Sequence, residues 1–268
     1  MNKRNIIVLY TIMTYALTLL FINSGYALVN ALAQVVPGFI ALLMIVFSRQ
    51  RINDLKQTGL LRLGKFRWYI IAFVVPVSAI VFSYLMGSFL GYFSADLNFS
   101  WPPLIYKILQ TTFTMPFLFA LGEEIGWRGF LQPRLTDLLG LKPGIFLTGI
   151  IWAVWHFIFI FFDGYYSDGN ALINASLFTI AIVFMSFSIG WIRSVSQSIW
   201  PCVIFHSASN ATLWMFSWRF KAINPNAVYI SGEAGILNIV FWAICLGIIW
   251  QKTRPASMVP SVSGINLT

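Results

Sequence analysis

Long apolar stretches, separated by short polar or charged segments, dominate this chain. A membrane-spanning helix needs about 20 mostly apolar residues, and eight stretches approach or exceed that length. They cover residues 5–23, 27–48, 68–93, 104–133, 144–162, 171–192, 199–216 and 234–251. The pattern predicts an all-α fold, a polytopic integral membrane bundle of about eight transmembrane helices.

The stretch 104–133 differs from the others because it is long and contains Pro116 and Gly122. We expect it to be kinked, or to begin as an interfacial segment. The polar residues 96–103 predict a loop, and residues 255–268 predict a disordered tail. Since no internal repeat or soluble domain is visible, we treat residues 1–268 as a single membrane domain.

Composition and charge agree with a membrane protein. Of 268 residues, 59% are hydrophobic and 9% are charged, whereas a soluble domain carries roughly 25% charged residues. The net charge of +9 does not indicate a nucleic-acid partner, because the basic residues lie between apolar stretches. If both termini are cytoplasmic, thirteen loop Lys and Arg residues fall on the cytoplasmic side and three on the other, namely Lys107, Arg219 and Lys221. This bias follows the positive-inside rule.

Charged residues inside an apolar stretch identify the candidate chemistry. Glu123, Glu124 and Arg128 would each be costly in a bilayer by a few kcal/mol. Glu124 and Arg128 are four residues apart, so they can pair on one face of a helix. Glu123 is rotated by about 100° from Glu124 and has no local cation, which makes it the candidate for a functional carboxylate.

Three further polar residues fall at a similar depth on two other predicted spans. His156 lies in the fifth, while His206 and Asn210 lie four residues apart on one face of the seventh. At about 1.5 Å per residue, all of these groups and Glu123 lie about 10–18 Å from the predicted cytoplasmic ends. They can therefore face one cavity.

Two reaction schemes use these residues. In the first, Glu123 and a histidine activate water, and the other histidine donates hydrogen bonds with Asn210 to a developing oxyanion. In the second, Glu123, His156 and His206 hold zinc and leave one position for water. We favour the metal-free scheme, with no cofactor, because His206 and Asn210 share a helical face. The residues themselves leave both schemes open.

The pattern resembles a known family. Glu123-Glu124-x-x-x-Arg128, an aromatic residue at Trp152 four positions before His156, and His206-x-x-x-Asn210 are similar to the motifs of the CAAX protease and bacteriocin-processing (CPBP, or Abi) family. These intramembrane proteases are related to the type II CAAX prenyl endopeptidases. The resemblance covers roughly residues 104–216, which we expect to be the catalytic core.

The resemblance implies a function and a role for each residue. It implies an endopeptidase with a cytosol-facing cavity, acting on a membrane-associated peptide or protein. Glu123 and His156 would activate water, and His206 and Asn210 would stabilise the oxyanion. Glu124, Arg128 and Trp152 would support them. The family often has Phe where this chain has Trp152, so the pocket beside His156 is expected to differ.

Two other classes of function remain as alternatives. Intramembrane Glu and His also form proton relays, so a proton-coupled transporter is one. A non-catalytic immunity or scaffold protein is the other. The short loops favour a protein of a bacterial cell membrane, with lipid and membrane-associated polypeptides as partners.

Overall fold

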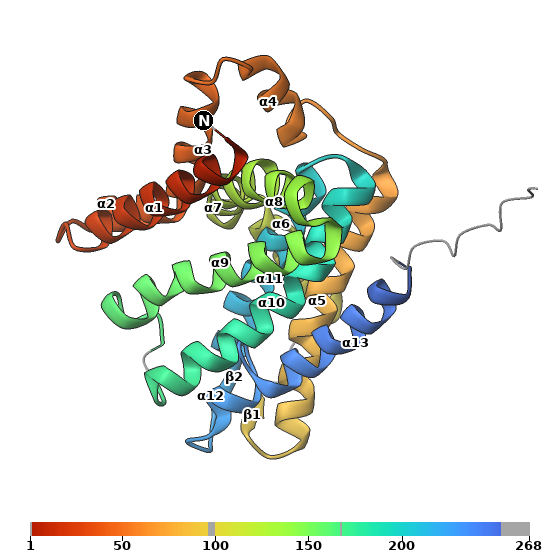
Figure 1. The fold of residues 1–268 in the computed structure, drawn as a ribbon. Coiled ribbons are helices and arrows are strands. Elements are labelled where there is room, and N and C mark those ends of the chain that lie inside the picture. Colours follow the sequence, from red (N-terminus) through yellow and green to blue (C-terminus); the bar gives the residue numbers. More distant parts are fainter. Residues whose placement is uncertain (1, 96–99, 167, 253–268) are drawn as a thin grey trace, which may run out of the picture.

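The computed structural model describes residues 2–95, 100–166 and 168–252. Over these ranges the chain is a bundle of helices with one very small sheet (Figure 1). The predicted all-α membrane fold is confirmed in this coarse form. The predicted tail 255–268 and residues 96–99 of the predicted loop lie outside the described residues.

Helices cover each of the eight apolar stretches. The elements are α1 (Lys3–Ile22), α2 (Ala27–Leu32), η1 (Ala33–Val35), α3 (Val36–Val46), α4 (Arg51–Thr58), α5 (Phe66–Phe89), β1 (Phe93–Ala95), α6 (Trp101–Thr112), α7 (Met115–Glu124), η2 (Ile125–Leu131), α8 (Gln132–Leu139), α9 (Leu141–Phe162), α10 (Ala171–Ser196), α11 (Trp200–Arg219), β2 (Phe220–Ala222), α12 (Ala227–Ile230) and α13 (Ile236–Lys252).

Not every helix is long and apolar enough to cross a membrane by itself. Within the described residues, five helical segments pass on length and hydropathy, and a bent pair makes up to six. The predicted total of eight spans and the cytoplasmic placement of both termini therefore stay predictions. The most buried of the remaining helices is α11, which packs against α5, α6 and α7.

The stretch 104–133 is not one straight helix. It forms α6 and then the segment Met115–Leu139, with a bend of 50° between them. Pro116 lies in the first turn of α7, where its missing N–H leaves no helical hydrogen bond unmade. Gly122 lies inside α7 and not at the bend. The predicted kink is therefore present, but it comes at residues 113–114.

A short antiparallel sheet joins two connections at one end of the bundle. Phe93 pairs with Ala222, and Ala95 pairs with Phe220. The sequence does not predict this sheet, because three-residue strands leave no alternating pattern in an apolar sequence. The Ser231 hydroxyl donates to the Ser83 carbonyl at 2.7 Å, which ties the segment before α13 to α5 at the same end (Figure 1).

Candidate active site

The last turn of α7 presents two adjacent carboxylates to the interior. Glu123 is 3% exposed and Glu124 is fully buried. Each has a partner four residues later in η2, a π-helix. The Trp127 indole N–H donates to Glu123 Oε2 at 3.3 Å, and Arg128 Nη1 donates to Glu124 Oε1 at 3.0 Å. The predicted Glu124–Arg128 pair is formed. Four residues after Glu123, the partner is an indole N–H and not a cation.

Trp152 of α9 gives Glu123 a second donor. Its indole N–H donates to the same oxygen, Oε2, at 2.8 Å. The ring also lies beneath the Arg128 guanidinium, 4.1 Å from the ring centre. A phenylalanine could keep the cation–π contact, but it could not make the hydrogen bond. The difference from the family pattern at this position thus adds a donor to the carboxylate.

Glu124 connects the arginine to a histidine. His206 Nδ1 lies 2.9 Å from Glu124 Oε1, the oxygen that also accepts from Arg128. A carboxylate can only accept, so Nδ1 carries the proton and the ring orientation is fixed. Arg128 is held further by a 3.2 Å hydrogen bond to the Ser186 hydroxyl of α10. Glu124 therefore pairs with Arg128 and also orients the ring of His206.

The other nitrogen of His206 faces Glu123. Nε2 lies 4.0 Å from Glu123 Oε1, the oxygen that the two indoles leave unused. This distance is too long for a direct hydrogen bond and short enough for one water to bond to both groups. Asn210, one turn further along α11, lines the same cavity.

His156 is oriented through the backbone of its own helix. Its Nδ1 lies 2.9 Å from the Trp152 carbonyl oxygen, so this nitrogen is the donor and Nε2 keeps its lone pair. The ring packs among aromatic side chains, with Trp155 and Phe178 each 4.8 Å away between ring centres. Trp152 thus touches both Glu123 and His156, through different atoms.

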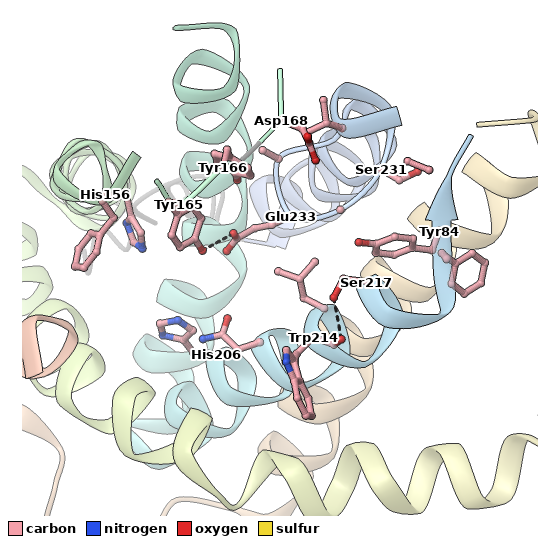
Figure 2. A pocket seen from close by; sticks show the side chains of 18 of the residues that line it. Tyr84, His156, Tyr165, Tyr166, Asp168, His206, Trp214, Ser217, Ser231 and Glu233 are labelled. Atoms are coloured by element: carbon pink, nitrogen blue, oxygen red, sulfur yellow. Dashed lines mark hydrogen bonds between the residues drawn. The ribbon is translucent and has the colours of Figure 1, made fainter. Parts of the chain in front are cut away.

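These side chains share one cavity of about 790 Å³. Glu123, His156, His206 and Asn210 all line it, as their matched depth predicted. Figure 2 shows His156 and His206 on separate helices, with Tyr165, Glu233 and Trp214 around the same space. The Tyr165 hydroxyl donates to Glu233 at 2.8 Å. Burial raises the pKa of Glu233 above its ordinary value, although this hydrogen bond opposes the shift.

Sequence reasoning missed several residues of the site. Trp127 could have been found, because it stands four residues after Glu123, the spacing that revealed the Glu124–Arg128 pair. Ser186, Tyr165 and Glu233 carry no such local signal, since they come from other helices and from connections distant in sequence.

The three residues of the zinc alternative, Glu123, His156 and His206, are not grouped as a metal cluster in this structure. Within the part of the chain that the structure describes, no three His, Cys, Asp or Glu side chains are grouped so that they could hold a metal ion. Hydrogen bonds occupy Glu123 Oε2 and His206 Nδ1, and they leave Glu123 Oε1 and His206 Nε2 4.0 Å apart. We therefore derive no step through zinc.

Comparison with known proteins agrees with the motifs. Residues 105–212 match the family model described as type II CAAX prenyl endopeptidase Rce1-like. The chain is also 27% identical, over 242 residues and 82% of each protein, to CAAX prenyl protease 2 of the archaeon Methanococcus maripaludis. The resemblance drawn from the three motifs is confirmed. In both comparisons, this membrane protein is thus similar to the type II CAAX prenyl endopeptidases.

Proposed function

We propose that this protein is an intramembrane endopeptidase that hydrolyses a peptide bond of a membrane-associated protein or peptide. The observation that carries the proposal is the shared cavity. A carboxylate, two histidines and an amide from three helices line one cavity of about 790 Å³. The name of the archaeal relative adds C-terminal peptides of prenylated proteins as one candidate substrate class.

The proposed reaction begins with a water between Glu123 and the histidines. Glu123 Oε1 takes a proton from this water. At the same time, the oxygen of the water attacks the carbonyl carbon of the scissile bond. Trp127 and Trp152 hold the carboxylate through Oε2. The lone pair on His156 Nε2 provides a second acceptor, which can orient the water.

Hydrogen-bond donors must stabilise the negative charge that forms on the carbonyl oxygen. The Asn210 amide and His206 Nε2 are the proposed donors, and His206 must carry a proton on each nitrogen for this role. The carboxylates of Glu123 and Glu124, on either side of the ring, stabilise that positive charge. When the tetrahedral intermediate collapses, the C–N bond breaks and the amine leaves with the proton held by Glu123.

The Glu123→Gln variant tests the proposal. It keeps the size of the side chain and removes its basicity, so we expect at least about a 100-fold loss of rate, the lower end of general-base contributions. Purified wild type and variant would be compared on a peptide library in detergent, with thermal unfolding as the control for folding. A variant within a few-fold of wild type would remove Glu123 from the mechanism.

The same assay separates the alternatives. A transporter or a non-catalytic immunity or scaffold protein would cleave no peptide in detergent. A transporter would instead move a proton or solute across proteoliposomes. Cleavage by the wild type and loss of cleavage in Glu123→Gln together favour the endopeptidase. A bacterial cell membrane remains our proposal for the location of the protein, and the relative named above is archaeal.

A further inference from the structure

We infer that the cavity opens on the non-cytoplasmic face of the membrane, so that the substrates are polypeptide segments presented on that face. That these segments are substrates rests on the function proposed above, whereas the direction in which the cavity opens does not. Basic residues gather at one end of the bundle, and the residues that line the cavity come from the other end.

One end of the bundle gathers most of the basic side chains. It contains the start of α1, α4 and its flanking segments, the end of α8, the turn between α10 and α11, and the end of α13. Its described Lys and Arg residues are Lys3, Arg4, Arg49, Arg51, Lys56, Arg62, Lys65, Arg67, Arg134, Lys142 and Arg193. By the positive-inside rule this end is cytoplasmic.

Contacts between these segments show that they form one end. Lys3 pairs with Asp137 at 3.0 Å, and the Trp200 indole donates to the Leu60 carbonyl at 2.9 Å. Lys142 lies 3.9 Å from the centre of the Trp250 ring. The basic segments are therefore adjacent in space although they are far apart in sequence.

The same end is closed beneath the site. Arg134 pairs with Asp54 at 2.8 Å, which holds the start of α4 against α8. Arg193 donates to the Arg128 carbonyl at 3.1 Å and to the Gln57 carbonyl at 2.7 Å. These buried and partly buried contacts lie between η2, which follows the carboxylates, and the basic surface.

The cavity is lined from the opposite end. Its outer residues come from β1, the connection 163–170, β2, α12 and the segment 231–234. Among the described residues that line it, none belongs to α4 or to the segments 47–65 and 193–200. Figure 1 shows β1, β2 and α12 at the far end of the bundle from α4.

These outer connections are joined to one another. The Tyr229 hydroxyl of α12 accepts from the Asn170 backbone at 2.7 Å, and Tyr165 bonds to Glu233. Lys107, Arg219 and Lys221 are the described basic residues on the elements of this side, outside the buried Arg128. The rim of the cavity thus belongs to the end with few positive charges.

The position of the histidine on α9 agrees with this direction. His156 lies six residues before the end of α9 at Phe162 and fifteen after its start at Leu141. At about 1.5 Å per residue, it is about 9 Å from the outer end and about 22 Å from the basic end. The cytosol-facing cavity expected from the family resemblance is therefore not what the charge distribution and the cavity lining favour.

The rim also suits a polypeptide at a membrane surface. Tyr165, Tyr166 and Trp214 line it together with Lys221 and Glu233. Tyr and Trp are the residues enriched at membrane–water interfaces, and the charged groups of both signs can bind polar parts of a peptide. An exported peptide or the segment beside a membrane helix would meet the cavity from this face.

Thiol labelling tests the direction of opening independently of activity. Single cysteine variants would be made in a background with Cys202→Ala and Cys245→Ala. Cells whose cell wall or outer membrane has been removed, but whose cell membrane is intact, would be treated with a membrane-impermeant maleimide. Ser217→Cys reports on the cavity wall, Asn23→Cys on the exposed turn after α1, and Gln50→Cys on the basic end; all three positions are exposed. Permeabilised cells give the full labelling of each variant.

We expect Ser217→Cys and Asn23→Cys to be labelled before permeabilisation, and Gln50→Cys only afterwards. Labelling of Gln50→Cys in intact cells, with protection of the other two, would overturn the orientation. Labelling of Asn23→Cys without Ser217→Cys would overturn the outward opening. Peptide cleavage in detergent does not depend on the orientation of the protein in a membrane. A lack of cleavage would therefore count against the proposed function and not against this inference.

Discussion

At the scale of single residues, the central feature is how a carboxylate is kept in an apolar interior. Glu123 makes no direct hydrogen bond to His206, whose Nε2 lies 4.0 Å from Oε1. Two indole N–H groups bind one of its oxygens instead. Hydrogen bonds to charged groups contribute about 1.5–3 kcal/mol each, which offsets part of the cost of burial. The second oxygen remains directed at the cavity.

The Trp152→Phe variant should slow the reaction. It removes the 2.8 Å hydrogen bond to Glu123 and keeps an aromatic ring for Arg128. We expect a fall in kcat of about tenfold or more, from a loss of at least about 1.5 kcal/mol, with a smaller change in KM. Steady-state kinetics on one cleaved peptide would measure both.

Trp200→Phe provides the matched control. Its indole N–H also makes one hydrogen bond, to the Leu60 carbonyl at 2.9 Å, but at the basic end. Its kcat should stay close to that of the wild type. If both variants lose rate equally, then the effect of Trp152→Phe is one of stability and not of positioning.

At the scale of elements, a close crossing positions the carboxylates. Gly122 and Gly126 stand four residues apart on either side of them, a spacing that allows helices to approach closely in membranes. A methyl group at Gly122 would lie 2.7 Å from the Val35 side chain, and one at Gly126 would lie 2.6 Å from the Pro37 backbone. The segment η1–α3 thus depends on both glycines to pack against α7 and η2.

Gly126→Ala should destabilise the protein by about 1–3 kcal/mol through overpacking, because backbone atoms of Pro37 block the new methyl group. Intrinsic helix propensity alone would predict that alanine stabilises the helix relative to glycine. Gly247→Ala in α13 is the control, since its methyl group would meet nothing within 4 Å. Thermal unfolding in detergent would compare them. An unchanged or raised Tm for Gly126→Ala would contradict the close packing.

The Glu124–Arg128 pair gives a prediction in which stability and activity separate. Glu124→Ala should cost about 3–5 kcal/mol, because it leaves the fully buried Arg128 unpaired. Combining Glu124→Leu with Arg128→Met should recover part of this stability, measured again by thermal unfolding. Activity should not recover, since His206 loses the carboxylate that orients it.

Two results would argue against this account. A double variant less stable than either single variant would mean that the two side chains do not act as a pair. A double variant with restored activity would mean that His206 needs no carboxylate on Nδ1.

At the scale of the whole molecule, the site exists only where four helices meet. α7 supplies Glu123 and Glu124, η2 supplies Trp127 and Arg128, α9 supplies Trp152 and His156, and α11 supplies His206 and Asn210. Ser186 of α10 completes the network around Arg128. The basic end and the cavity end of the bundle are a property of this whole arrangement and not of any one helix.

We expect fully active, purified protein to contain far less than one zinc per chain. The reason is the arrangement of Glu123, His156 and His206, which does not form a cluster that could hold a metal. Elemental analysis would be paired with a titration of activity against a chelator. Stoichiometric zinc, whose removal abolishes activity and whose return restores it, would contradict the metal-free scheme.

The sequence by itself determined what local spacing controls. Apolar length predicted the helices, the i,i+4 spacing predicted the Glu124–Arg128 pair, and three motifs in order predicted the family. A bilayer makes this possible because each spanning helix satisfies its own backbone within its own segment. The tertiary structure decided the rest, because the partners come from distant parts of the chain. These are the indole of Trp152 on Glu123, the contact of Glu124 with His206, the bend after α6, the sheet, and the end at which the cavity opens.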